Sequence, residues 1–278
     1  MNLEETIIHV YLRVEEKYRA ITGGCRIRAH GFAPSLTDPE IITMEIVGEM
    51  QGRHDDTAIW RYFHDHWQEW FPQLGSYKNF TKHAANLVWI KQRIMEELFP
   101  AHDDVHIIDG VPMPVCHKAR ASRCRTFEDT AAWGYCAAKD EYYFGMRGHP
   151  VINLKAQVVA FPLTPANAGE RDALFDIVNK IRGILLGDKG FLGKELKEEM
   201  QLHGVDLQTP LRDNMIETRT EKEVQTILRV RRLVETVIGI LTEKFSIASI
   251  KARDLWRLSS RVYRKLLAYN FYVEIRGS

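Results

Sequence analysis

The sequence predicts an α/β protein in which an all-helical N-terminal region precedes a mixed β-sheet flanked by helices. Residues 1–100 place their apolar side chains at helical spacing and carry helix-capping signals. From Val105 onward, short β-rich runs come first and then alternate with helical segments, as in sheets whose strands are joined by crossover helices. We therefore expect a helical region over residues 1–100 and an α/β domain over residues 101–278.

Three helices are expected in the N-terminal region. Thr37 and Glu40 have the spacing of a capping box, and the helix behind them should stop near Gly52. Apolar spacing predicts further helices over residues 56–67 and 81–98. The region is a candidate for binding DNA ends, in the manner of a helix-turn-helix. Core packing is the expected role of the tryptophans at Trp60, Trp67, Trp70 and Trp89.

The second region begins with a strand over residues 105–109. A hairpin is expected at Lys139-Asp140, and a helix is expected to start at Asn167 with Glu170 completing its cap. This order, strands first and then helix, strand, helix, strand, helix, is that of the ribonuclease H-like α/β fold. The remaining predicted elements are strands over 133–138, 141–146, 154–161, 184–186 and 205–211, and helices over 193–203, 221–244 and 252–273.

Acidic residues stand at three places where this fold could bring them together. Asp109 and Asp188 each end a short apolar strand, and Glu235 lies within a long helix. Carboxylate oxygens are the hard ligands that Mg²⁺ prefers, and two such ions can stabilise the attacking and leaving oxygens of a phosphodiester. We expect all three carboxylates to bind metal and Glu235 to lie on a half-buried helix face. The alternatives are Asp103 and Asp104, in a solvated loop before the first strand, and Glu223 and Glu243 on the helix.

Composition excludes several classes of protein. The 278 residues are 45% hydrophobic and 27% charged, which is typical of globular proteins. No stretch is long and apolar enough to span a membrane, and the acidic N-terminus lacks a secretory signal, so a cytoplasmic protein is expected. Four cysteines without a CxxC pair predict reduced thiols and argue against a zinc site.

The distribution of charge indicates nucleic acid as a partner. The net charge is only +1, but from Arg229 to the end eleven basic residues face four acidic ones. Residues 1–100 have eleven basic and fourteen acidic residues. A positive C-terminal third can follow phosphates, although a solvated helix face is the simpler explanation for any single residue. The candidate DNA-binding residues are Arg120, Arg123, Arg147, His149, Lys189, Arg231, Arg232, Arg253, Arg257, Arg261 and Lys265.

Sequence segments around these acids resemble the DDE-type transposases of bacterial insertion sequences. The matching segments are IIDGVPMPVC, WGYCAAKDEYYFGMRGH, LTPAN, GDKGF, RRLVET and FSIASIKARD, which occur in family order over roughly residues 36–272. The resemblance implies a ribonuclease H-like core, a triad of Asp109, Asp188 and Glu235, and two Mg²⁺ or Mn²⁺ ions. One departure is that Leu228 and Thr242 occupy places where a related pattern has tyrosine and lysine.

The resemblance also implies partners and a reaction. The partners would be double-stranded DNA, as terminal inverted repeats and as target, and a second copy of the chain in a homodimer or larger assembly. Water would attack in the cutting step and the freed 3′-hydroxyl in the joining step, at one two-metal site. Two alternatives stay open at this point: a nuclease of the same fold without strand transfer, and a DNA-binding protein whose catalysis is lost.

Overall fold

The computed structural model describes residues 1–25, 27, 34–127, 129–212 and 215–277, and it forms two compact units. One unit, here called unit 1, combines Met1–Phe99 with Glu243–Ser278, and unit 2 comprises Pro100–Thr242. The sequence predicted one boundary near residue 100 and placed the C-terminal helix in the α/β domain. That helix instead joins unit 1, because its buried face packs against two N-terminal helices.

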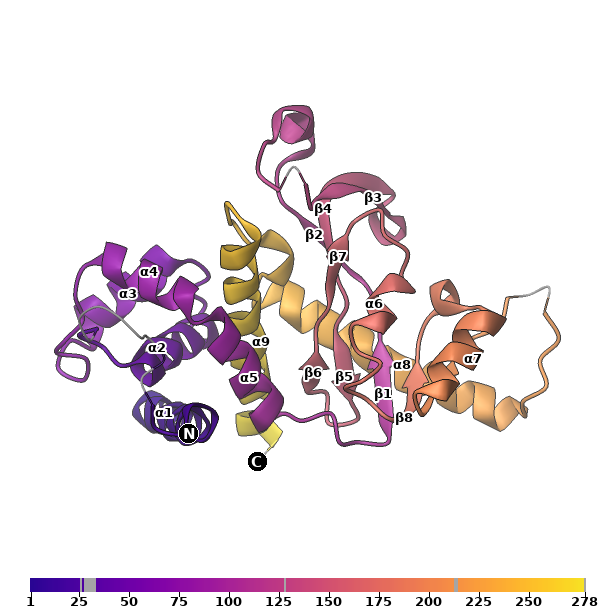
Figure 1. The fold of residues 1–278 in the computed structure, drawn as a ribbon, viewed down its shortest axis with the longest axis horizontal. Coiled ribbons are helices and arrows are strands. Elements are labelled where there is room, and N and C mark those ends of the chain that lie inside the picture. Colours follow the sequence, from indigo (N-terminus) through magenta and orange to yellow (C-terminus); the bar gives the residue numbers. More distant parts are fainter. Residues whose placement is uncertain (26, 28–33, 128, 213–214, 278) are drawn as a thin grey trace. The chain divides into compact units, whose positions relative to one another are not determined.

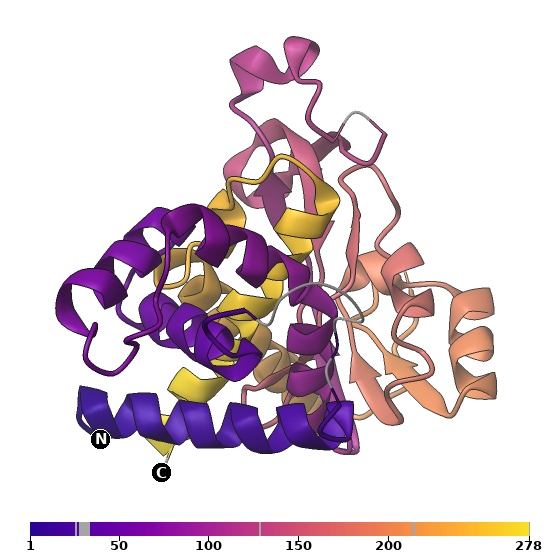
Figure 2. The same ribbon diagram turned by 60° about the vertical axis from the view of Figure 1, so that its left-hand side comes forward.

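Unit 1 is entirely helical within the described residues. Its last helix packs against α2 and α5, and α1 packs against the same two helices (Figure 2, α1 in indigo). The predicted capping box is confirmed: the Glu40 carboxylate accepts from the Thr37 amide at 2.6 Å, and the Thr37 hydroxyl accepts from the Glu40 amide. The helices are α1 (Leu3–Thr22), α2 (Asp38–Met50), α3 (Asp56–His66), α4 (Tyr77–Asn86), α5 (Val88–Leu98) and α9 (Leu255–Gly277).

Two expectations for unit 1 were wrong. The single helix predicted over residues 81–98 is broken at Leu87, which ends α4 and precedes α5. Because Leu87 is itself buried, the apolar spacing continues through the break and hides it from the sequence pattern. Trp70 and Trp89 are 41% and 53% exposed, so they are not core residues.

Unit 2 contains the central sheet, whose strand order is β6-β5-β1-β8-β9 (Figure 1). β1 runs antiparallel to β5 and parallel to β8, and β9 extends the parallel part. This is the mixed sheet of the predicted ribonuclease H-like fold, so the predicted fold class is confirmed. The strands are β1 (Val105–Ile108), β5 (Val151–Asn153), β6 (Val158–Ala160), β8 (Gly183–Leu186) and β9 (Val205–Gln208).

The predicted hairpin belongs to a second, smaller sheet. Its order is β2-β4-β3, with β7 also paired to β4. Cys136 pairs with Glu141, so the turn holds four residues rather than two. After β4 the chain passes through His149 and Pro150 into β5, a strand of the central sheet. The strands of the central sheet are short. The strands are β2 (Val111–Pro114), β3 (Ala132–Cys136), β4 (Glu141–Gly148) and β7 (Leu163–Pro165).

The two faces of the central sheet have different surroundings. On one face Ile108, Leu185 and Leu207 join a buried apolar cluster with residues of α6 (Asp172–Phe175) and α7 (Lys194–Leu202). On the other face a cleft of about 640 Å³ separates the strands from α8 (Glu221–Glu243). α6 is much shorter than the helix expected from Asn167. Among the described residues, no helix combines the length and apolar character needed to cross a membrane.

Candidate active site

The two predicted aspartates lie at one edge of the central sheet. β1 and β8 are parallel, and Ile107 pairs with Leu186, so Asp109 and Asp188 both follow the carboxyl ends of neighbouring strands. On the other side of β8, the pairing with β9 extends to Gly187, whose backbone amide donates to the Gln208 carbonyl at 3.0 Å. Parallel pairing therefore brings together two residues that are 79 positions apart in the sequence.

Each aspartate uses one carboxylate oxygen to accept from the turn that follows it. Asp109 Oδ1 lies 2.7 Å from the amide nitrogen of Gly110, and Asp188 Oδ1 lies 2.7 Å from that of Gly190. Both residues are half-buried. These contacts are the hydrogen bonds to turn amides that are expected of ordinary acids at strand ends. Each aspartate also has a second carboxylate oxygen that this bond does not use.

The pKa of Asp109 responds to both of the other predicted acids. Burial raises the pKa of Asp109 above its ordinary value, and the negative charges of Asp188 and Glu235 raise it further. The Gly110 amide and the positive charge of Arg231 act in the opposite direction. Asp109 therefore lies within electrostatic range of Asp188, which follows another strand, and of Glu235, which lies on a helix.

Glu235 is more exposed than the sequence predicted. Its neighbours Val234 and Val237 are buried, but the glutamate itself is exposed, so the expected half-buried face is wrong for this side chain. Two of the alternative acids have structural roles instead. Glu223 accepts from the Thr220 amide at 2.7 Å at the start of α8, and Asp103 accepts from the Asn153 side chain at 2.9 Å.

A fourth acid, Glu170, lies beside the aspartates and was missed as a site residue. Its carboxylate pairs with Arg147 at 3.0 Å, and a Cβ atom added at Gly190 would meet both Glu170 Oε2 and Asp188 Oδ1. Burial and then the charge of Asp188 raise the pKa of Glu170 to about 7. The sequence pattern suggested only that Glu170 caps a helix. No residue spacing identifies Glu170 as a site residue, because its position depends on how the loop before α6 folds.

The donor chemistry of this region fits a divalent cation. All four acids offer hard carboxylate oxygens, and their mutual repulsion is the kind that a divalent cation relieves. Among the described residues, however, no three His, Cys, Asp or Glu side chains already form a cation-binding arrangement. The four cysteines have free thiols. The residues therefore have the ligand chemistry that Mg²⁺ or Mn²⁺ prefers, but the described residues do not already form a coordination geometry for the ion.

Several predicted DNA-binding residues are accessible. Arg120 and Arg123 are exposed on a 3₁₀ helix, η1 (Lys118–Arg123), which follows β2. Arg147 is committed to Glu170, and Arg231 is half-buried with its Nε lacking a hydrogen-bond partner among the described residues. The other exposed candidates are Lys189, Arg232, Arg253 and Arg257, the last of which pairs with Asp254.

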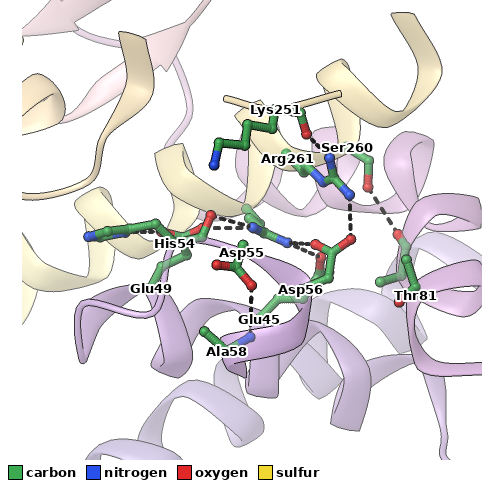
Figure 3. Close-up of polar contacts among 12 residues, drawn as sticks. Glu45, Glu49, His54, Asp55, Asp56, Ala58, Thr81, Lys251, Ser260 and Arg261 are labelled. Carbon is green, nitrogen blue, oxygen red and sulfur yellow. Dashed lines mark hydrogen bonds and ion pairs between the residues drawn. The ribbon is translucent and has the colours of Figure 1, made fainter. Parts of the chain in front are cut away.

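Three other candidates are held by internal contacts, two of them buried and Arg261 half-buried, which argues against the predicted DNA contacts. His149 is buried beside the Thr164 hydroxyl at 3.0 Å, and burial, with Arg147 nearby, lowers the pKa of this histidine to about 4. Lys265 is buried against Glu49. Arg261 reaches the Asp56 carboxylate at 2.5 Å (Figure 3). The regular spacing of basic residues along α9 therefore reflects an internal ion-pair network more than a DNA-binding face.

A basic cleft that the sequence did not reveal lies next to this region. It has a volume of about 620 Å³ and is formed by the segment after Asp188, by α7 and by the chain that follows β9. Its basic lining comes from sequence segments too far apart to appear as a cluster of charge. Those residues are Arg171, Lys194, Lys197, Arg212 and Arg219, with Glu217 as a counter-charge.

Comparison with known families adds an independent observation. Residues 100–255 match the family model described as "Transposase DDE domain", and this stretch is more than half of the 278 residues. It includes Asp109, Asp188 and Glu235. Neither the curated proteins nor the solved structures searched gave a match.

Proposed function

Since the chain belongs to the transposases with a DDE domain, we propose that it cuts DNA at the ends of its own insertion element and joins the freed 3′ ends to target DNA. One observation carries the proposal for the site. Asp109 and Asp188 follow neighbouring parallel strands at the same sheet edge, and both Asp188 and Glu235 act on the charge of Asp109. In this proposal, the three acids from distant parts of the sequence would supply the negative ligands that phosphoryl transfer needs.

The proposed roles follow from the position of each group. Asp109, Asp188 and Glu235 would hold two Mg²⁺ or Mn²⁺ ions, which would activate the attacking oxygen and stabilise the leaving oxygen. The Gly110 and Gly190 amides fix the two aspartates in their turns. Arg231 lies close enough to act on the charge of Asp109 and would balance negative charge at the site.

Binding of DNA is proposed to use basic residues on both sides of the acids. Arg120 and Arg123 on η1 and the basic cleft beside α7 would contact phosphates. The substrates would be double-stranded DNA, as terminal inverted repeats and as target. Two element ends must be processed together, so a homodimer or larger assembly is proposed to act on nucleoid DNA in the cytoplasm.

Isosteric substitutions test the assignment of the acids. Asp109→Asn, Asp188→Asn and Glu235→Gln should each lower cleavage of an element end by at least about a hundredfold. Gel-shift affinity for the same DNA should stay close to that of the unmodified chain. Glu199→Gln, on the exposed surface of α7, is the matched control and should cleave normally. Undiminished cleavage by any of the three variants would remove that residue from the site.

The joining step and the cation are tested separately. Element ends that are already cut, mixed with plasmid DNA and Mg²⁺, should yield joined products, and EDTA should abolish them. A protein that cuts the ends but never joins pre-cut ends would instead be a nuclease of the same fold. Activity that persists in EDTA would contradict the proposed role of a divalent ion.

A further inference from the structure

The carboxylate of Glu170 fills the space between the turns that follow Asp109 and Asp188. A Cβ atom added at Gly190 would lie only 1.7 Å from Glu170 Oε2. A Cβ atom at Gly110 would lie 3.9 Å from Glu170 Oε1. Glycine at position 190 therefore leaves room for this fourth acid, whereas a Cβ atom at Gly110 would make only an ordinary van der Waals contact with it.

Helix capping does not explain this placement. The backbone amide of Gly169 donates to Asp172 at 2.9 Å, so the turn at the start of α6 uses the carboxylate of Asp172. Glu170 instead faces Arg147 on β4, whose Nη1 donates to it at 3.0 Å. The Nη2 group of Arg147 donates to the Tyr135 carbonyl at 3.3 Å, which anchors the guanidinium to the hairpin.

Glu170 and Asp188 present carboxylate oxygens to the same small space. A Cβ atom at Gly190 would lie 1.7 Å from Glu170 Oε2 and 2.9 Å from Asp188 Oδ1. Adjacent oxygens around an octahedral Mg²⁺, with bonds of 2.0–2.1 Å, stand about 3 Å apart. One cation could therefore be bound by both carboxylates without a large movement of either side chain.

We propose that Glu170 is a fourth cation-binding carboxylate of this site and that Arg147 holds it in position until the cation binds. This inference rests on the proposed function, because it assumes that Asp188 binds a divalent ion. Arg147 then has two effects: it orients Glu170 through Oε1, and its positive charge competes with the cation for the same carboxylate.

Manganese binding to the full chain without DNA tests the inference independently of catalysis. Free Mn²⁺ is measured by electron paramagnetic resonance during titration. Glu170→Gln should weaken binding by about tenfold. Arg147→Gln removes the competing charge and should strengthen binding. That gain should shrink in the double variant, because the carboxylate for which Arg147 competes is then gone.

Two further variants make the outcomes distinguishable. Glu199→Gln should bind Mn²⁺ like the unmodified chain, and thermal unfolding of each variant reports whether it is folded. If Asp188→Asn loses Mn²⁺ binding while Glu170→Gln stays within twofold of the unmodified chain, the inference about Glu170 is wrong and the proposed function stands. If Asp188→Asn also binds normally, the proposed metal site itself is wrong.

Discussion

The ammonium group of Lys265 lies 2.9 and 2.8 Å from the two carboxylate oxygens of Glu49, and both side chains are buried in unit 1. Glu49 also accepts from Arg264 at 2.7 Å and contacts the His54 ring at 2.8 Å (Figure 3). Buried charges are tolerated only when they are paired in this way. Lys265 is thus an internal residue that joins α9 to α2.

Removing this lysine should destabilise unit 1. Lys265→Met leaves part of the Glu49 charge uncompensated in the interior, and breaking a buried pair costs about 3–5 kcal/mol. Denaturant unfolding followed by circular dichroism measures the loss. Arg253→Met, at an exposed position, should change stability by no more than about 0.5 kcal/mol. Weaker DNA binding by Lys265→Met at unchanged stability would contradict the internal role.

Stability should fall as the pH drops below the ordinary pKa of histidine. In the folded chain the pKa of His149 is lowered from 6.5 to about 4 by burial. The unfolded chain therefore takes up a proton first, and the stability due to neutral His149 is complete above pH 6.5 and lost towards pH 4. The loss at this one site is about 3 kcal/mol.

Comparison with a variant isolates the contribution of His149. Burial also lowers the pKa of His106, so the unmodified chain contains more than one such group. His149→Asn should show a shallower dependence of unfolding free energy on pH between 6.5 and 4. Equal slopes for the two proteins would mean that His149 is protonated as readily in the folded chain as in the unfolded one.

The exposed arginines of η1 should contribute to DNA affinity without reading sequence. Replacing both Arg120 and Arg123 by alanine should weaken binding of terminal-repeat and unrelated DNA to a similar degree. The slope of log affinity against log salt should fall by about two, because two phosphate contacts are lost. Fluorescence anisotropy at several salt concentrations measures both effects. A loss confined to terminal-repeat DNA would indicate base contacts instead.

Glycine should be required at position 190. An alanine there would place Cβ 1.7 Å from Glu170 Oε2 and 2.9 Å from Asp188 Oδ1, so both acids must shift. Gly190→Ala should lower cleavage by about a hundredfold, as expected when catalytic groups are misplaced by about 1 Å. Gly239→Ala is the control, because its added Cβ meets nothing within 4 Å. It should stabilise α8 by about 0.5–1 kcal/mol and leave cleavage unchanged.

The parts of the fold that sequence predicted best are those fixed by local chemistry. The capping box at Thr37 and the strands that end at Asp109 and Asp188 depend on neighbouring residues, and they lie where expected. The positions of those strands in the sheet followed from the order of elements alone. The hairpin was predicted but the second sheet that it joins was not, since local pairing does not determine which larger sheet a strand joins.

Side-chain roles that depend on tertiary packing were harder to predict. The spacing of Arg261 and Lys265 is the same for a solvated face as for a buried ion-pair face, and only the acids of α2 and α3 distinguish the two. Glu170 lies in an irregular loop near Asp188. The sequence of that loop has no periodic pattern from which this position could be predicted. Glu235 was placed correctly on a long helix, but the exposure of one helical residue depends on what packs beside it.

Unit 1 is built from two segments that lie on either side of unit 2 in the sequence, and this bears on the order in which the protein folds. As synthesis proceeds, α1 to α5 emerge first but lack α9, against which α2 and α5 pack. Unit 2 follows and has its strands and α8 once residue 243 has left the ribosome. Unit 2 can therefore fold during translation before the N-terminal helices gain α9 as a packing partner.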